Sequence, residues 1–379
     1  MKVLQVTNIV SHHQLPFAKE VCKIVGKENF LFAAMSEVSE ERLNNGWKSQ
    51  FSESWIIHPN LDSESMRRFN DFWSEADIVL CGERLITKIQ SRLDDKKICI
   101  YMSERWWKPP VGMLRLCSPA YLKMFFSFLR LTKSEYFHYF PIGPFADSDM
   151  RLVTSMNNRV WRWGYFTEKP KILPERSYDV INILWIGRML SWKRVDLLIE
   201  ALGRLKNDGI EFRLTLVGDG KERGKLQKLA VNLLGNDYFQ LLDFIPSTQV
   251  PQLMSQNDIY VLPSSGFEGW GAVINEAMWM GCAVVASNKT GAGASMINHG
   301  VNGYLFKSGS VSSLYEHLKK LISDRAHLKE VGDNAKLSIE RSWSPSVAAE
   351  RFVYLSNSLL DKKIAAPAYD GLLSSCNRQ

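Results

Sequence analysis

The sequence lacks several features that would assign a chain of 379 residues to a common functional class. No run approaches the ~20 apolar residues that a membrane-spanning helix needs. No predicted strand is followed by a complete G-x-G-x-x-G, which disfavours a dinucleotide oxidoreductase. The six cysteines, at positions 22, 81, 99, 117, 282 and 376, lack metal-site spacing. We therefore expect reduced thiols in a cytosolic protein, and the strand pattern of Met1–Val6 indicates no signal peptide.

The composition is that of a globular protein with a basic surface. Hydrophobic residues make up 45% and charged residues 23% of the chain, and the formal net charge is +7. A chain of this length is long for a single core, so two domains are expected. The positive charge favours an acidic partner, such as a phosphate compound, nucleic acid or an anionic membrane face.

Short apolar runs alternate with amphipathic stretches along most of the sequence. This alternation predicts an α/β protein with parallel sheets that helices cover on both faces. Pro170 and Pro174 mark a linker. We predict one domain over residues 1–168 and a second over 175–342. A helix over 345–360 is expected to pack back on the first domain, and residues 361–379 are expected to be disordered.

The stretch 261–287 combines a strand, a loop, a helix and a second strand. The loop Pro263–Gly271 is rich in serine and glycine, and it follows a strand at the sheet edge where open α/β sheets bind ligands. Glycines let backbone amides approach a ligand, and a helix start attracts phosphate. Glu268 in the loop and Glu276 in the helix can accept sugar or ribose hydroxyls. Alternatively, the loop is a tight turn with solvated acids.

Two earlier strands of the second domain also end in candidate ligand-binding residues. The first is followed by Gly187, Arg188 and Lys193, and the next by Gly218-Asp219-Gly220. An arginine fork and a lysine point charge suit a diphosphate, and the glycines could pass beside a base. Each feature alone is equally typical of a surface arginine or a simple turn, but their shared placement at one edge favours a nucleotide site.

In the first domain, strand ends are expected to line one crevice. They present His12 and His13, Gly82-Glu83, and Ser103-Glu104-Arg105. For each histidine, an ordinary surface position is the alternative. Asp147 and Asp149 mimic a metal-binding Asp-x-Asp, but we expect them at a helix start, where acids favour the dipole. No metal site is therefore predicted.

Residues 105–133 contain six lysines or arginines, no acidic residue and many aromatic residues. Ser118-Pro119 is a good helix start, and the predicted helix Ala120–Leu131 carries Lys123 and Arg130 on one face. This pattern favours a segment lying in an anionic membrane interface. The alternative is a core helix with basic ends that reach solvent. The segment is too apolar for a nucleic-acid groove.

Three motifs carry a family resemblance: GRM…KRVDLLIEAL, LTLVGDG and DIYVLPSSGFEGWGAVINEAMWMGCAVVAS. They resemble the retaining glycosyltransferases of family 4, specifically over residues 180–310. VTNIVSHHQLPFA, YMSERWW and RVWRWGYF more loosely resemble bacterial enzymes that make capsule, O-antigen or exopolysaccharide. The resemblance implies the GT-B fold, with two Rossmann-like doubly wound parallel-sheet domains and an inter-domain cleft.

The resemblance also implies roles for individual residues. Arg188 and Lys193 would hold the donor diphosphate, Glu268 the donor sugar hydroxyls and Glu276 the ribose diol. Phe267 and Gly269 would present backbone amides to sugar and phosphate. No metal and no cofactor is implied. Many family members have a Gly-Gly pair in the first loop, but this sequence reads Ser11-His12-His13-Gln14. One histidine, of which we select His13, could face the acceptor or the leaving phosphate.

The sequence thus predicts a retaining, metal-independent glycosyltransferase. Its donor would be a nucleotide-sugar, UDP-sugar rather than GDP-sugar, and its acceptor a saccharide, in particular a lipid-linked one. We expect it at the cytoplasmic face of the cell membrane, bound through residues 105–133, without nucleic acid. A GT-B sugar-nucleotide epimerase and a non-catalytic membrane-associated scaffold are the alternatives.

Overall fold

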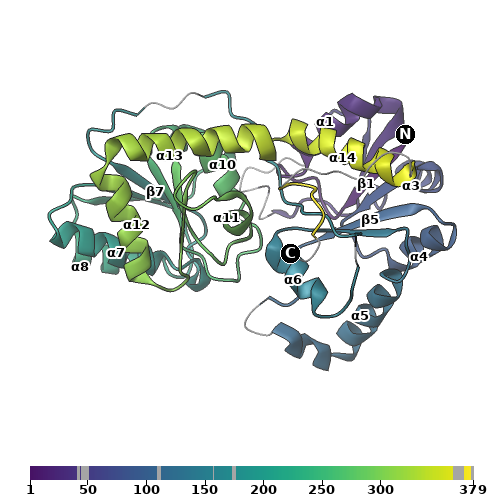
Figure 1. Cartoon of the computed structure of the whole chain (residues 1–379), viewed down its shortest axis with the longest axis horizontal. Helices are drawn as coiled ribbons and strands as arrows, with labels where there is room; N and C mark the ends of the chain where they lie inside the picture. Colours follow the sequence, from purple (N-terminus) through teal and green to yellow (C-terminus); the bar gives the residue numbers. More distant parts are fainter. Residues whose placement is uncertain are drawn as a thin grey trace. The chain divides into compact units, whose positions relative to one another are not determined.

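The chain folds into two compact units, Met1–Glu168 with Ser344–Gln379 (unit 1) and Lys169–Trp343 (unit 2), which are described separately (Figure 1). Each unit contains a parallel sheet of six strands with helices, which confirms the predicted α/β architecture of two sheets. The computed structural model describes residues 1–40, 43, 51–108, 112–156, 158–172, 176–361 and 371–376, without the side chains of 115 and 116.

The sheet of unit 1 has the strand order β3-β2-β1-β4-β5-β6. Its central strand β1 pairs in parallel with β2 and β4, and nearly all strand residues are buried, as expected for a sheet covered on both faces. The strands are β1 (Val3–Thr7), β2 (Phe30–Ala34), β3 (Ile56–Ile57), β4 (Ile78–Cys81), β5 (Ile98–Ser103) and β6 (Phe137–Pro141).

The helices of unit 1 connect these strands and cover the sheet. α3 begins after Asp62, whose carboxylate accepts a hydrogen bond from the Ser65 amide. Asp147 and Asp149 lie in a helix, as expected, which begins at Pro144 and ends at Arg151. The helices are α1 (Leu15–Val25), α3 (Ser63–Glu75), α4 (Ile86–Asp94), α5 (Pro119–Leu131), α6 (Pro144–Arg151) and α14 (Pro345–Leu360), with 3₁₀ turns η1 (Lys27–Asn29) and η2 (Gly112–Cys117).

The last part of the chain completes the core of unit 1. α14 packs against α1, and the Phe352 ring meets the Phe17 ring edge-on at a centroid distance of 5.5 Å. The expectation of a disordered tail is wrong for residues 371–376. Leu372 and Leu373 are fully buried, and Ser375 forms an antiparallel bridge with Trp161. Residues 362–370 and 377–379 lie outside the described part of the chain.

The sheet of unit 2 has the order β12-β11-β10-β7-β8-β9, so β7 lies between β10 and β8. The strands are parallel, and their carboxyl ends therefore lie at one edge of the sheet. They are β7 (Asn182–Ile186), β8 (Arg213–Val217), β9 (Phe239–Leu242), β10 (Ile259–Leu262), β11 (Ala283–Ser287) and β12 (Tyr304–Phe306).

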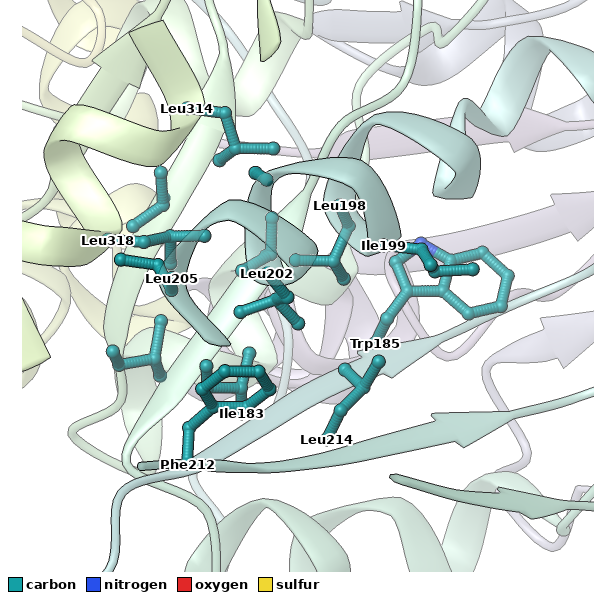
Figure 2. Close-up of a cluster of buried hydrophobic side chains, with 14 of the residues drawn as sticks. Ile183, Trp185, Leu198, Ile199, Leu202, Leu205, Phe212, Leu214, Leu314 and Leu318 are labelled. Atoms are coloured by element: carbon teal, nitrogen blue, oxygen red, sulfur yellow. The ribbon is translucent and has the colours of Figure 1, made fainter. Parts of the chain in front are cut away.

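The core of unit 2 forms where amphipathic helices cover this sheet. Figure 2 shows leucines of α7 next to Ile183 of β7, and Leu318 of α12 beside Leu205 of α7. The helices are α7 (Val195–Asn207), α8 (Arg223–Leu234), α9 (Val250–Ser255), α10 (Val273–Trp279), α11 (Gly291–Met296), α12 (Val311–Ser323) and α13 (Arg325–Ser338), with short turns η3 (Ser191–Lys193), η4 (Ser247–Gln249) and η5 (Ile339–Trp343). In the described residues, no helix combines the length and apolar character needed to cross a bilayer.

A buried arginine joins α4 to α3, to the residues between α3 and β4, and to β5. Arg92 of α4 is 2% exposed. Its guanidinium donates hydrogen bonds of 2.5–3.0 Å to the carbonyl oxygens of Ile98, Trp73, Ala76 and Asp77. Burial lowers its pKa from the usual value. The planar fork of arginine suits four separate acceptors, because its donors point in several fixed directions.

We predict that Arg92→Lys destabilises the protein by about 3 kcal/mol or more. The single ammonium of lysine cannot reach all four carbonyls, and each lost bond from a charged donor costs about 1.5–3 kcal/mol. Urea unfolding measures the effect. The matched control is Arg67→Lys on the exposed side of α3, which should change stability by less than about 0.5 kcal/mol. Equal stability of the two variants would contradict the prediction.

Candidate functional site

The candidate site of unit 2 lies where three neighbouring strands end. β7 leads into Gly187 and the exposed Arg188, β8 into Gly218, and β10 into the loop that starts at Pro263. Because β10, β7 and β8 are adjacent in the sheet, the three loops that the sequence singled out come together at one edge.

The loops after β7 and β8 touch through their backbones. Gly218 has φ 130°, and a Cβ atom there would lie 2.0 Å from the carbonyl oxygen of Gly187. At Gly220, φ is 146° and a Cβ atom would lie 2.5 Å from the Met189 oxygen. The Met189 amide donates to the Asp219 oxygen at 2.7 Å. Both glycines are therefore required by the fold itself, and their predicted contact with a nucleotide stays a prediction.

The loops after β7 and β10 are joined by an ion pair and an aromatic pair. The Lys193 Nζ lies 2.6 Å from Glu268 Oε2, and the two side chains are 15% and 12% exposed. The neighbouring rings of Trp192 and Phe267 have centroids 6.3 Å apart, and the Lys193 Nζ lies 4.4 Å from the Trp192 ring. The Ser265 amide also donates to the Trp192 oxygen at 2.9 Å. Two residues with separately predicted roles are thus direct partners.

The residue after Lys193 has an unusual backbone conformation. Arg194 adopts φ 53° and ψ 40°, the left-handed region that costs most residues energy. Its guanidinium forms hydrogen bonds of 2.8–3.2 Å with both oxygens of Asp196, in the first turn of α7. Strain of this kind gathers at functional loops, and here it sets the direction in which the chain leaves Lys193.

The loop between β10 and α10 is held by its neighbours. Trp270 is 1% exposed, and its indole N–H donates to Asn275 Oδ1 at 2.9 Å. The Gly291 and Ala292 amides at the start of α11 donate to the oxygens of Gly269 and Trp270 at 3.2 and 2.8 Å. This contact leaves no room for a side chain at Gly291, whose Cβ would lie 2.5 Å from the Gly269 oxygen. The loop is therefore fixed before any ligand binds.

Two carboxylates influence the pKa of Tyr260 of β10. Its hydroxyl donates to the Ile186 oxygen at 3.4 Å. Burial, and then the charges of Glu268 and Glu276, raise the pKa of Tyr260 well above its usual value. Burial also raises the pKa of the Glu276 carboxyl to about 7. Glu276, in the first turn of α10, therefore titrates near neutral pH.

In unit 1, His12 and His13 lie in the loop between β1 and α1. Their ring centroids are 3.8 Å apart, and the His13 ring stacks on Tyr165 at 5.8 Å. Burial, and then the charge of His12, lower the pKa of His13 well below its usual value. His13 is consequently a neutral imidazole at pH 7, a form that can accept or donate a single proton.

The strand ends of unit 1 also line a cavity of about 580 Å³. The cavity brings together Gly82-Glu83 and Ser103-Glu104-Arg105, as the sequence predicted, with Asn8 and Gln14 of the first loop. His12 and His13, which were predicted for the same crevice, are not among the residues that line it.

The sequence analysis did not predict that Asp149 binds neighbouring residues at this edge of the sheet. It is 4% exposed, binds the Arg105 guanidinium at 3.1 Å and accepts the Trp107 amide at 3.0 Å. Its position in an Asp-x-Asp pattern gave no sign of a partner 44 residues away.

Comparisons with known proteins find relatives of this chain. Residues 169–338 match the family described as Glycosyl transferases group 1. An uncharacterized glycosyltransferase of Methanocaldococcus jannaschii is 32% identical over 189 residues, which cover 48% of this chain and 47% of that protein. The amylovoran biosynthesis glycosyltransferase AmsK of Erwinia amylovora is 28% identical over 195 residues, which cover 50% and 48%. The chain spans about half the length of these relatives.

The fold extends over nearly the whole chain. The crystal structure of Anabaena HepE in complex with UDP aligns with a TM-score of 0.69 and 16% identity, covering 94% of this chain and 100% of that one. The two parallel six-stranded sheets are thus those of the GT-B fold, as the sequence predicted. Within this fold, residues 169–338 are the part that matches the family described as Glycosyl transferases group 1.

Proposed function

We propose that the protein is a glycosyltransferase that moves a sugar from a nucleotide-sugar to a saccharide acceptor in the synthesis of a bacterial surface polysaccharide. The observation that carries the proposal is the pairing of Lys193 with Glu268, within the residues that match the glycosyl transferases group 1 family. Arg188 follows the same strand as Lys193, and Glu276 lies in the helix after the loop of Glu268. The relative AmsK, named for amylovoran biosynthesis, supports a polysaccharide product.

Arg188 and Lys193 hold the donor diphosphate in this proposal. Arg188 is exposed at the end of β7, and Lys193 follows in the short turn η3. An ammonium has three donors, so Lys193 can keep its bond to Glu268 and also bind a phosphate oxygen. As the anomeric bond breaks, negative charge grows on the diphosphate, and fixed positive groups stabilise that transition state.

Glu268 orients the donor sugar by accepting hydrogen bonds from its hydroxyls. Its carboxylate is held by Lys193 at 2.6 Å, on a loop whose backbone is fixed by α11. The backbone amides of Phe267 and Gly269 serve the sugar and the phosphate. A carboxylate fixed in advance needs little reorganisation when the sugar develops oxocarbenium character.

Glu276 accepts both hydroxyls of the donor ribose, and Gly218 and Gly220 lie beside the base. The donor is a UDP-sugar rather than a GDP-sugar. Structures of the fold neighbour HepE contain UDP, and one contains UDP-glucose. This structural similarity supports UDP as the nucleotide of the donor. The identity of the donor sugar has to be found by experiment.

The reaction is proposed to retain the anomeric configuration and to need neither metal nor cofactor. The acceptor hydroxyl attacks the face that the diphosphate leaves, and the leaving phosphate oxygen takes its proton, so no carboxylate nucleophile is required. His13, a neutral imidazole, is assigned to the acceptor or the leaving phosphate.

We predict that UDP affinity depends on the ionisation of Glu276. The raised pKa of about 7 means that the carboxylate, which accepts both hydroxyls, is lost as pH falls through 7. Glu276→Gln should weaken UDP binding about 10-fold at pH 8, because hydrogen bonds to charged groups contribute about 1.5–3 kcal/mol each. Calorimetric titration at pH 6 and 8 should show a smaller pH effect in the variant than in wild type.

The control for this experiment is Glu211→Gln, an exposed position of unit 2, which should bind UDP like wild type at both pH values. GDP titrated in parallel tests the choice of nucleotide. Unchanged UDP affinity of Glu276→Gln at pH 8 would rule out the ribose role of Glu276, and absence of UDP and GDP binding in wild type would rule out the donor site.

Membrane association is proposed to use one face of α5 and η2, which we call the basic-apolar face: Leu114, Lys123, Phe126 and Arg130. Leu114 and Phe126 are 70% and 59% exposed, whereas Phe125, Phe128 and Leu131 on the other side of α5 are buried. Residues 105–133 contain no acid. Exposed apolar side chains between basic ones suit an anionic lipid surface, and they place the enzyme at the inner face of the membrane beside a lipid-linked acceptor.

We predict that Lys123→Glu/Arg130→Glu weakens binding to anionic vesicles by at least about 10-fold, because each basic residue near the surface contributes about 1 kcal/mol. Co-sedimentation with vesicles of phosphatidylglycerol and phosphatidylcholine measures it. The matched control, Lys225→Glu/Lys228→Glu on the exposed side of α8, changes the net charge equally and should bind like wild type. Equal loss in both variants would show a non-specific charge effect and contradict the proposed face.

A further inference from the structure

The ammonium of Lys193 has a second partner besides the carboxylate of Glu268. Its Nζ atom lies 2.6 Å from Glu268 Oε2, and it also lies over the Trp192 ring, 4.4 Å from the ring centroid. A cation within about 6 Å of a ring centroid is attracted by the negative face of the ring, and tryptophan attracts it most strongly among the aromatic side chains. The ammonium is therefore held between a charged group and an uncharged one.

These two partners occupy most of the hydrogen-bonding capacity of Lys193. An ammonium has three N–H donors and no acceptor. One N–H is donated to Glu268, and the ring face of Trp192 occupies a second side. Within the described part of the chain, Lys193 Nζ makes no other hydrogen bond. A single N–H therefore remains for a ligand, and its direction is set by the positions of the carboxylate and the ring.

The Trp192 ring is itself held in place. Trp192 lies in the turn η3, and its carbonyl oxygen accepts a hydrogen bond of 2.9 Å from the Ser265 amide. The Phe267 ring packs beside the indole, with a centroid distance of 6.3 Å and an interplanar angle of 31°. This distance lies within the range of aromatic pairs, about 4.5–7 Å. The backbone and the neighbouring ring thus restrict how far the indole can turn away from the ammonium.

An uncharged partner has an advantage where a diphosphate is expected to bind. The Glu268 carboxylate attracts the ammonium, but it also repels an approaching phosphate, because like charges close together in a half-buried place repel one another strongly. The face of an aromatic ring attracts the ammonium without carrying a net charge. Trp192 can therefore keep Lys193 in position when a phosphate oxygen weakens the bond between Lys193 and Glu268.

We propose that Trp192 is a positioning residue of the donor site, whose ring face holds the Lys193 ammonium so that its remaining N–H is directed at the diphosphate. The inference rests on the proposed function, because it takes the diphosphate as the ligand of Lys193. Trp192 acts through Lys193 and does not touch the phosphates. Two other roles for the half-buried Trp192 are separated from this one by experiment: a direct hydrogen bond from its indole N–H to the ligand, and simple filling of space.

Site-specific incorporation of fluorinated tryptophans at position 192 of the full chain tests this role. Each fluorine withdraws electron density from the ring face and weakens its attraction for a cation, while the shape of the side chain hardly changes. We expect the dissociation constant of UDP, measured by calorimetric titration, to rise step by step through the mono-, di-, tri- and tetrafluoro series. The total increase should be about fivefold, as expected for one cation–π contact at a partly exposed position.

The direction of the trend distinguishes the three roles. Fluorine makes the indole N–H a stronger donor, so a direct hydrogen bond to the ligand would tighten UDP binding along the series. A ring that only fills space would give the same dissociation constant throughout. Either result overturns the proposal.

Uridine, which lacks the diphosphate, is the second ligand. It should bind wild type and the whole fluorinated series equally, because Lys193 has no phosphate to hold in uridine. A loss of uridine affinity equal to the loss of UDP affinity would place the ring against the nucleoside and would also overturn the proposal.

The matched control is the same fluorinated series at Trp73 of unit 1. This tryptophan also has a lysine over its ring, with the Lys88 Nζ 5.7 Å from the centroid. Fluorination there should leave the UDP dissociation constant unchanged.

Two ordinary substitutions give an independent measurement. Trp192→Phe retains a ring face and should bind UDP more tightly than Trp192→Leu, which fills part of the same space without one. Equal affinity of these two variants would contradict the role of the ring face.

Titration of wild type separates this inference from the proposed function. UDP binding to wild type, with one dissociation constant throughout the fluorinated series, overturns the role of Trp192 and leaves the donor site standing. If neither UDP nor GDP binds to wild type, the donor site is overturned, and the inference about Trp192 is overturned with it.

Discussion

The candidate donor site depends on the close approach of two backbones, at Gly187 and Gly218. A Cβ atom at Gly218 would lie 2.0 Å from the Gly187 oxygen, so no other residue fits without moving the loop after β7. That loop carries Arg188 and Lys193. The Lys193–Glu268 ion pair and the hydrogen bond from Ser265 to Trp192 then fix the loop after β10 to it. The positions of Arg188 and Lys193 therefore depend on Gly218, because any side chain there would clash with the Gly187 carbonyl.

Much of this arrangement could be predicted, because parallel strands bring their carboxyl ends to one edge. The order of motifs along the sequence was sufficient to expect Arg188, Gly218 and Glu268 near one another. The alternation of strands and amphipathic helices in unit 2 follows the predicted apolar pattern. These features depend on local periodicity and on topology, which the sequence carries directly.

Specific contacts between distant residues could not be predicted in the same way. Lys193 and Glu268 are 75 positions apart, and no local pattern says that they pair. Gly218 and Gly220 suggested a ligand, whereas the structure shows that they first allow two loops to touch. The tail beyond residue 360 has little local pattern, yet Leu372 and Leu373 are buried because unit 1 offers them a surface. Such contacts depend on how surfaces fit together in the folded protein, and the periodicity of the sequence does not reveal that fit.

The two ends of unit 1 in the sequence are separated by the whole of unit 2. During synthesis, β1 to β6 leave the ribosome long before α14, because about 175 residues of unit 2 lie between them. At 5–20 residues per second this interval lasts roughly 9 to 35 seconds. Over that time Phe17 and the adjoining surface of α1 lack the ring of Phe352. Unit 2 can therefore complete its fold first, and the nascent unit 1 is the part of the chain that needs protection from aggregation.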